Sequence, residues 1–223
     1  MDVALQRNVE FKLEEDEVLS RYIDSSCRLC RREGFKLHLK GERCYTDKCS
    51  VDRRNYPPGQ HRISRRKLSD YSLQLREKQK VRSIYRLQEK QFSLFFKRAE
   101  QMKGSTGVNF LTLLERRLDN VIYKLGFSQS RSEARQMVRH GFFSVNQRKV
   151  NIPSYVLSKG QVIQLRKKAE RVNQIFELSG KRERPSWLDV DSKNFQGVVK
   201  ELPTREDITI PIEEKLIVEY YSR

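Results

Sequence analysis

The stretch that decides the fold runs from Leu111 to Leu165 and reads LTLLERRLDNVIYKLGFSQSRSEARQMVRHGFFSVNQRKVNIPSYVLSKGQVIQL. Its first part repeats apolar residues at helical spacing, which predicts one amphipathic helix that ends at Gly126. Ser130 and Glu133 then form a capping box, which opens a second helix that ends at Gly141. Strands are expected over 142–145, 148–152 and 162–165, with a turn at 146–147. The stretch therefore predicts two helices followed by a small sheet. The apolar set of the first helix is Leu111, Leu114, Leu118, Val121, Ile122 and Leu125.

The second predicted helix carries three arginines at intervals of four residues, and this spacing stacks them along one side as a cationic ridge. A guanidinium donates two parallel hydrogen bonds, which match the oxygens of a phosphate. A solvated helix face is the alternative interpretation. We expect the ridge and three nearby basic residues to contact phosphates and riboses of folded RNA: Arg117, Arg131, Arg135, Arg139, Arg148 and Lys149.

The charge of the chain indicates a polyanionic partner. Its 223 residues carry a net charge of +17, and residues 21–180 alone hold 36 basic and 14 acidic residues. Such a surface repels itself unless a polyanion neutralises it, and nucleic acid is the leading candidate because binding releases counterions from its phosphates. An anionic membrane is the competing partner, but no run of about 20 apolar residues exists to span one. The acidic residues 14–17 also argue against a signal peptide, so we expect a cytoplasmic protein.

All four cysteines lie between residues 27 and 49, in two pairs that could close a tetrahedral shell around zinc. A cytosolic chain seldom keeps disulfides, which favours a metal over cystine. An iron–sulfur cluster also takes four cysteines, and metal-free thiols are the third possibility. A metal here would be structural, because every ligand position is filled. The predicted ligands are Cys27, Cys30, Cys44 and Cys49, with His38 and His61 as spare donors.

Two helices are predicted before the central stretch. Ser69 caps one over about 70–85, and the other spans about 88–103. The second has an aromatic stripe that we expect in the core rather than against RNA bases. The glycine-containing residues 104–107 are expected to mark a domain boundary. The stripe consists of Phe92, Phe95, Phe96, Ala99 and Met102.

The remaining segments are less patterned. Residues 1–20 are expected to be a disordered or weakly docked addition. The basic loop over 50–68 is expected to become ordered only against RNA, with a flexible linker as the alternative. A further helix is expected over 166–178 and a linker over 179–185, and Trp187 is expected to anchor the end of the module. The strongly apolar tail over 208–221 should pack back on the phenylalanine-rich helix.

Motifs along most of the chain resemble one family. In the central stretch they are Arg117-Leu118-Asp119-Asn120-Val121, Ser130-Arg131-Ser132-Glu133-Ala134-Arg135-Gln136-Met137-Val138, Gly141 and Val145-Asn146; outside it they are Arg21-Tyr22-Ile23, Cys27-Arg28-Leu29-Cys30-Arg31-Arg32-Glu33-Gly34, Pro57-Pro58-Gly59-Gln60-His61, Leu68-Ser69-Asp70-Tyr71, Leu75-Arg76-Glu77-Lys78-Gln79-Lys80 and Leu216-Ile217-Val218-Glu219. Over residues 21–223 the chain is similar to the bacterial ribosomal protein "S four" family of the small subunit, and its cysteines resemble those of the metal-carrying branch. Gln147 and Arg62 stand where the family usually has glycine.

The resemblance implies an α+β fold that is mainly helical. A helical domain (68–106, completed by 189–223) would carry an inserted RNA-binding module of two helices and a small sheet (107–188). Before these lie residues 1–20, an extension without family counterpart, and residues 21–67, the four-cysteine metal-binding and basic loop region. The tail, 189–223, would pack on the helical domain.

The resemblance also implies a structural role in the small ribosomal subunit, as a primary rRNA-binding protein that nucleates assembly of the subunit body and contributes to translational accuracy. The implied partners are small-subunit rRNA, mRNA at the entry channel, and ribosomal proteins "S three", "S five" and "S twelve". The implied residues fall into three groups: further rRNA contacts at Arg28, Arg31, Arg32, Arg76 and Lys80, the mRNA entry at Arg62, Arg65, Arg66 and Lys67, and a protein-facing surface at Leu216, Tyr220 and Tyr221.

Other functions use similar modules. Pseudouridine synthases and tyrosyl-tRNA synthetases carry them beside a catalytic domain, but no phosphate-binding glycine loop, HExxH motif or Ser/His/Asp set is present here, and only three histidines occur. We therefore expect no enzymatic activity. A free RNA chaperone and an mRNA-binding translational repressor are the remaining alternatives.

Overall fold

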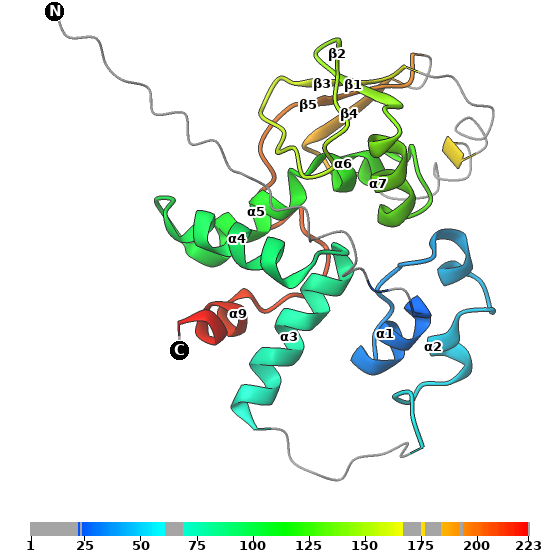
Figure 1. Cartoon of the computed structure of the whole chain (residues 1–223), viewed down its shortest axis with the longest axis vertical. Coiled ribbons are helices and arrows are strands. Elements are labelled where there is room, and N and C mark those ends of the chain that lie inside the picture. The colour runs from blue at the N-terminus through cyan, green and yellow to red at the C-terminus, as the bar shows by residue number, and fades with distance from the viewer. Residues whose placement is uncertain are drawn as a thin grey trace, which may run out of the picture.

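The computed structural model describes residues 22, 24–60, 69–166, 175–176, 184–191 and 194–222. Helices and a five-stranded antiparallel sheet make up this part of the chain, which confirms the predicted α+β class. The sheet, with α6 and α7 beneath it, lies at one end of the molecule, and α3, α4, α5 and α9 form the other end (Figure 1). None of the described helices is long and apolar enough to cross a membrane.

The first group of elements, here called the helical body, is built around an aromatic core. It contains α3 (Asp70–Ile84), α4 (Glu89–Glu100), α5 (Thr106–Glu115) and α9 (Glu214–Tyr221). Ser69 caps α3 as predicted, because its Oγ accepts a hydrogen bond from the Ser72 N–H. Phe92 and Phe96 are buried and pack edge-on against Phe110, which confirms that the aromatic stripe is core. Met102 is the exception, since it lies beyond the end of α4 and is 40% exposed.

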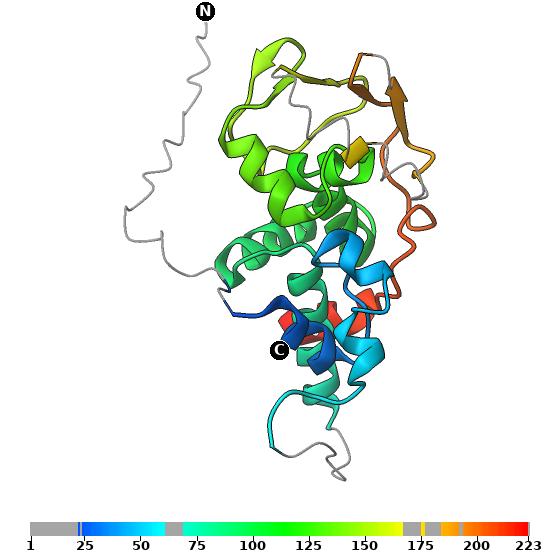
Figure 2. The same ribbon diagram turned by 90° about the vertical axis from the view of Figure 1, so that its right-hand side faces the viewer.

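The tail returns to the helical body. The Tyr221 ring stacks on Phe96 with 4.5 Å between ring centroids, which confirms the predicted packing on the phenylalanine-rich helix. Ile208, Ile212 and Ile217 are buried in the same core. The tail forms the helix α9 from Glu214 to Tyr221. In Figure 2 the chain descends in orange from the sheet to this red helix.

The single helix predicted up to Gly126 is in fact two helices. After α5, Arg117 takes an extended conformation (φ −64°, ψ 137°) and α6 (Leu118–Leu125) begins. The first N–H groups of α6 have partners in a distant loop, because Leu118 N donates to Tyr155 O and Asp119 N donates to Pro153 O. The chain therefore passes from one hydrophobic core to the next at 116–117.

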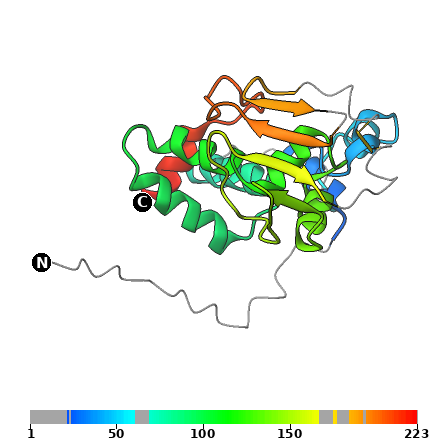
Figure 3. The ribbon, with the colours of Figure 1, turned by 90° about the horizontal axis from the view of Figure 1, so that it is seen from above.

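The second group, here called the sheet body, comprises α6, α7 (Arg131–Arg139) and the sheet. Its strands are β1 (Phe143–Val145), β2 (Arg148–Lys149), β3 (Val162–Leu165), β4 (Leu188–Asp191) and β5 (Gln196–Val199), in the order β2-β1-β3-β5-β4. Figure 3 shows the strands side by side over the helices. The strands β4 and β5 were not predicted from the sequence. Most of the helix expected over 166–178 and of the following linker lies outside the described residues.

Two local features of the sheet body follow the predicted chemistry. The Ser130 Oγ accepts from the Glu133 N–H, so the capping box opens α7, and the Glu133 carboxylate in turn accepts from the Gln129 N–H. Asn146 and Gln147 both have positive φ, at 48° and 67°, which is the type I′ pattern. Gln147 adopts a positive φ although it has a Cβ atom, which glycine lacks.

The cysteine segment is a third, smaller unit. It contains α1 (Ser26–Glu33), the 3₁₀ helix η2 (Gly41–Tyr45) and α2 (Ser50–Arg53). Leu37, Leu39 and Val51 join the core of the helical body. Gly41 approaches the sheet body closely, because a Cβ there would lie 2.8 Å from Gln129 O.

Candidate nucleic-acid interface

The predicted RNA-contacting side chains divide by exposure. Arg28, Arg32, Arg139, Arg148 and Lys149 are exposed. Four others are partly buried: Arg31, Arg76, Lys80 and Arg135. Two arginines, Arg117 and Arg131, are buried.

Burial removes Arg117 and Arg131 from the predicted surface. Arg117, 1% exposed, donates from Nε and Nη2 to the two carboxylate oxygens of Asp119 at 3.1 and 2.7 Å. Arg131 donates from Nε to Asn120 Oδ1 at 2.8 Å and lies over the Tyr123 ring. Neither guanidinium has an exposed face for a phosphate, so the ridge predicted from four-residue spacing is reduced to Arg135 and Arg139.

The two buried arginines belong to a polar network between the helical body and the sheet body. Asn120 Nδ2 donates to the backbone oxygen of Glu115 at 2.9 Å and to its Oε2 at 2.7 Å. The Tyr85 hydroxyl donates to the other Glu115 carboxylate oxygen at 2.6 Å. Burial, followed by the Glu115 charge, raises the pKa of Tyr85 well above its usual value, so the hydroxyl keeps the proton that it donates. Because hydrogen bonds between buried groups rigidify a structure, this network fixes how α5 meets α6 and α7.

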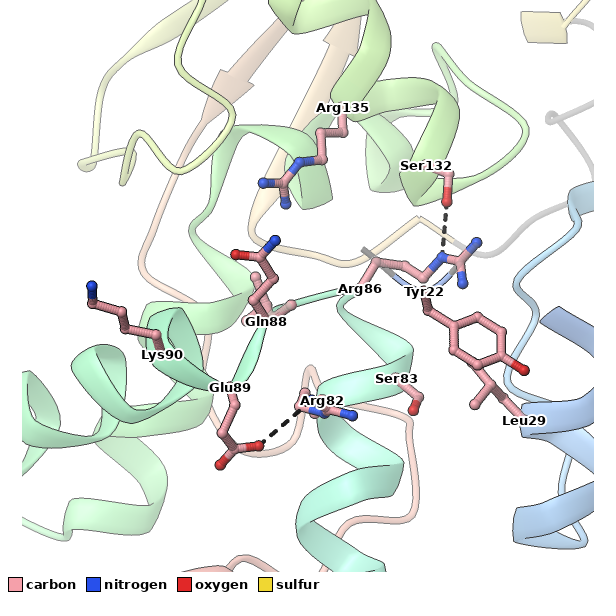
Figure 4. A pocket seen from close by; sticks show the side chains of 11 residues that line it. Tyr22, Leu29, Arg82, Ser83, Arg86, Gln88, Glu89, Lys90, Ser132 and Arg135 are labelled. Carbon is pink, nitrogen blue, oxygen red and sulfur yellow. Dashed lines mark hydrogen bonds and ion pairs between the residues drawn. The ribbon is translucent and has the colours of Figure 1, made fainter. Parts of the chain in front are cut away.

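A hollow of about 670 Å³, here called the interdomain hollow, lies between α7 and the α3–α4 connection (Figure 4). Arg135 points into it from α7, and Arg82, Arg86 and Lys90 line it from the helical body. Glu89, which pairs with Arg82 at 3.6 Å, is the one carboxylate among its lining residues. The hollow therefore offers several cations to a ligand that spans both bodies.

Arg86 is a functional candidate that the sequence did not indicate. It donates from Nε to Ser132 Oγ of α7 at 2.9 Å and from Nη2 to Ser26 Oγ of α1 at 3.0 Å. Its φ of 55° places it in the left-handed region between two helices, where no periodic pattern marks it. Burial lowers the pKa of Arg86, yet an arginine remains charged at neutral pH. Arg86 thus joins the cysteine segment, α3 and α7 at one point.

The exposed basic residues of the sheet body lie at its open edge. Arg148 and Lys149 form the edge strand β2, which pairs only with β1 in the described sheet. A Cβ on Gly141, at the end of α7, would clash with the Lys149 side chain, so Lys149 passes close to the end of the helix that bears Arg139. Arg139 of α7 and the β2 residues Arg148 and Lys149 therefore place their positive charges close together on the surface.

The residues Arg76 and Lys80, implied as rRNA contacts, are already paired inside the protein. Arg76 forms an ion pair with Glu33 of α1 at 2.9 Å, and Lys80 pairs with Glu77 at 2.8 Å. Burial raises the pKa of Glu33, with the Arg76 charge opposing that effect. Arg76 therefore joins α3 to α1, whereas Lys80 pairs within α3 itself.

The four cysteines are free thiols, with Cys30, Cys44 and Cys49 buried and Cys27 partly buried. Burial raises the pKa of Cys30 to about 11. The backbone N–H of Lys40 points at Cys44 Sγ at 3.4 Å, a contact that a thiolate ligand would accept. No group of three or more His, Cys, Asp or Glu side chains in the described ranges is arranged to hold a metal ion.

The remaining predicted site residues differ in their surroundings, and some lie outside the described residues. The His38 ring stacks on Tyr45 at 4.8 Å. His61 and the predicted mRNA-entry residues Arg62, Arg65, Arg66 and Lys67 lie outside the described residues. In the expected protein-facing surface, Leu216, Tyr220 and Tyr221 are all partly buried, and the Tyr221 hydroxyl donates to Glu89 at 3.1 Å.

The described residues thus combine a basic body of two helices and a sheet with a helical body, which defines an α+β protein of two parts. Residues 21–115 match the family "Ribosomal protein S4/S9 N-terminal domain", and residues 116–163 match the "S4 domain" family. The limit between the two matches coincides with the break between α5 and α6.

The chain belongs to the family of "Small ribosomal subunit protein uS4". A relative of that name from Syntrophobacter fumaroxidans is 56% identical over 208 residues, which cover 92% of this chain and 100% of the relative. Relatives from Geobacter sp. (strain M21) and Oleidesulfovibrio alaskensis are 60% and 59% identical, with the same coverage.

Proposed function

We propose that this protein is a structural component of the small ribosomal subunit, binds its rRNA directly, and has no enzymatic activity. One observation carries the proposal: relatives named for the small ribosomal subunit match at 56–60% identity over their entire length. The exposed cations of α7 and β2 and the net charge of +17 agree with a polyanionic ligand.

The geometry favours recognition of RNA shape. A-form duplexes hide their base edges in a deep groove, so proteins contact phosphates and 2′-hydroxyls in a fixed spatial arrangement. The buried network around Asn120 holds the sheet body, as an RNA-binding module, at a set angle to the helical body. Arg139, Arg148 and Lys149 on one body and Arg82 on the other can then contact one folded RNA.

The test is the salt dependence of binding to the small-subunit rRNA. Arg139→Ala removes one exposed cation, so the slope of log K against log salt should become shallower by roughly 0.7–0.9. Arg135→Ala should act in the same direction. Lys200→Ala is the control, because Lys200 is also exposed but pairs with Asp189 at the far strand of the sheet. Equal slopes for Arg139→Ala, Arg135→Ala and the control would reject the phosphate role of α7.

Sedimentation separates this function from its alternatives. A subunit component should remain with small subunits in sucrose gradients at high salt, whereas a free RNA chaperone or an mRNA repressor should leave them. Binding that shows no preference for small-subunit rRNA over unrelated structured RNA would refute the proposal.

We further propose the finer role that the family resemblance implies: nucleation of the subunit body, a contribution to translational accuracy, and a position at the mRNA entry beside proteins "S three", "S five" and "S twelve". The partly exposed tail helix, which carries several apolar side chains, suits a protein partner. Crosslinking from Leu216 should capture protein "S five", and crosslinking from Arg65 should capture mRNA. Capture of rRNA alone at both positions would contradict this role.

We also propose that Cys27, Cys30, Cys44 and Cys49 bind a structural metal, zinc in the first place and an iron–sulfur cluster as the alternative. The support is chemical: four free thiols lie in one segment, three are buried, and a backbone N–H points at one sulfur. Since they are not arranged as a closed site here, binding would have to draw the thiolates together. The metal would supply a crosslink between α1, η2 and α2.

Elemental analysis and absorbance of the purified protein distinguish zinc, a coloured cluster and metal-free thiols. If metal is bound, a chelator should lower the melting temperature of the wild-type protein and leave Cys44→Ser unaffected. One equivalent of neither zinc nor iron would refute the proposal.

A further inference from the structure

Arg86 occupies the turn between α3 and α4 in a backbone conformation that favours glycine. Its N–H donates to Ser83 O at 3.3 Å, and the Leu87 N–H donates to Arg82 O at 3.1 Å. These two bonds form a Schellman motif, in which the residue with the left-handed backbone is usually glycine. Arg86 has a φ of 55° at this position, although its Cβ makes that conformation unfavourable. Contacts of the side chain should therefore offset this strain.

The Arg86 side chain bridges two helices that belong to different parts of the fold. Its Nε donates to Ser132 Oγ in the first turn of α7 at 2.9 Å (Figure 4). Its Nη2 donates to Ser26 Oγ at the start of α1 at 3.0 Å. Ser26 is buried, and Arg86 is itself partly buried. The start of α1, the end of α3 and the start of α7 thus meet at one guanidinium.

These contacts use the pair of donors with which an arginine can hold an anion. Arg117 shows what the pair does with a carboxylate, because its Nε and Nη2 donate to the two oxygens of Asp119. In Arg86 the same two nitrogens donate to two neutral hydroxyls that lie on separate helices. A guanidinium engaged in this way acts as a crosslink within the protein rather than as an open phosphate receptor.

The crosslink orients cations that line the interdomain hollow. Ser132 lies one helical turn before Arg135, which points into the hollow from α7. Arg82 lies one turn before Arg86, in the last turn of α3, and lines the same hollow. The bond between Arg86 and Ser132 therefore restricts where Arg135 lies relative to Arg82.

We propose that Arg86 is a positioning residue for RNA binding, which acts through Ser26 and Ser132 and does not itself contact phosphate. It holds α7 against the end of α3 and the start of α1, so that cations on both bodies are in place before a folded RNA binds. Ordering these elements in advance removes part of the conformational cost of association. This inference rests on the proposed function and adds to it a residue that sets the geometry of the hollow.

Two substitutions of Arg86 separate its side-chain bonds from backbone strain and from charge. Arg86→Gly removes the side chain but suits the left-handed backbone, so the variant should stay folded with a melting temperature close to that of the wild type. Arg86→Lys keeps the positive charge but lacks the planar fork that reaches both serines. Both variants should bind the small-subunit rRNA on the order of tenfold more weakly than the wild type.

The salt dependence of binding distinguishes positioning from direct contact. A positioning residue releases no counterion, so both variants should keep the wild-type slope of log K against log salt. Arg135→Ala is the matched comparison, because Arg135 lines the same hollow and loss of its phosphate contact should reduce the slope by roughly 0.7–0.9. A slope reduced to the same extent in Arg86→Gly would overturn the inference, and so would wild-type affinity in that variant.

A double-mutant cycle tests whether Arg86 acts through the two serines. Ser26→Ala and Ser132→Ala change no charge, and each should weaken rRNA binding in part. Combined with Arg86→Gly they should weaken it no further, since the bonds that they remove are already absent, and additive losses would overturn the inference. If the wild-type protein binds the rRNA without preference, the proposed function fails as a whole, which is distinct from a failure confined to Arg86.

Discussion

Replacement of Asn120 by alanine tests whether the buried network couples the two bodies. Asn120 is 1% exposed and makes three hydrogen bonds, two donated to Glu115 and one accepted from Arg131. Two of these bonds involve charged groups. A bond to a charged group contributes about 1.5–3 kcal/mol and a neutral one about 1 kcal/mol, so Asn120→Ala should destabilise by about 4 kcal/mol. For a chain of this size that corresponds to a melting temperature lower by roughly 10 °C.

The assay can follow each body separately. Trp187 is the single tryptophan and is buried in the core of the sheet body, so its fluorescence reports that body. Far-ultraviolet circular dichroism follows mainly the helices. If the network couples the bodies, urea unfolding of the wild-type protein should give coincident transitions, and Asn120→Ala should lower and separate them.

Asn109→Ala is the matched control for this experiment. Its side chain donates to two backbone oxygens at the surface, which water can satisfy after the change. We expect it to cost less than about 1 kcal/mol. The reasoning is refuted if Asn120→Ala shifts the transitions no further than Asn109→Ala does, because the buried charges would then have other partners of equal strength.

Three smaller changes test other parts of the structure. Gln147→Gly should stabilise the sheet body by about 0.5–1 kcal/mol in urea unfolding, since glycine adopts the left-handed turn without strain, and a loss of stability would contradict the turn assignment. Gly197→Ala should destabilise it by about 1–3 kcal/mol, because the new Cβ would lie 2.5 Å from Leu125 Cδ1; an unchanged melting temperature would show that Leu125 yields freely. Burial and the Glu89 charge raise the pKa of Tyr221, so wild-type stability should fall above about pH 10, where the unfolded phenol ionises, and Tyr221→Phe should remove part of that fall. An identical pH profile for Tyr221→Phe would argue against this contact.

Two helix starts and one strand followed directly from local chemistry. Ser69 and Ser130 cap α3 and α7 as predicted, and β3 spans the predicted residues 162–165. These features depend on residues that are close in sequence, so their side chains and backbone meet wherever the segment lies in the fold.

The residues of the candidate nucleic-acid interface were harder to predict from local sequence. Spacing placed Arg131 and Arg135 on one side of α7, but Arg131 turns inward to Asn120 and Tyr123. Arg86 gave no periodic signal, and it contacts Ser26 and Ser132, which lie far from it in sequence. Which arginines remain exposed therefore depended on contacts between segments that sequence patterns do not pair.

By itself, the sequence determined the α+β class, the capped helices, the aromatic core and the basic character of the surface, because periodicity and charge are properties of the chain alone. Only the tertiary structure decided that α5 and α6 are separate helices, that β4 and β5 complete the sheet, and that Arg117 and Arg131 are buried. Each of these depends on hydrogen bonds or packing between distant residues, such as Leu118 with Tyr155 or Gly197 with Leu125. Such pairs form when the chain folds, and no local pattern encodes them.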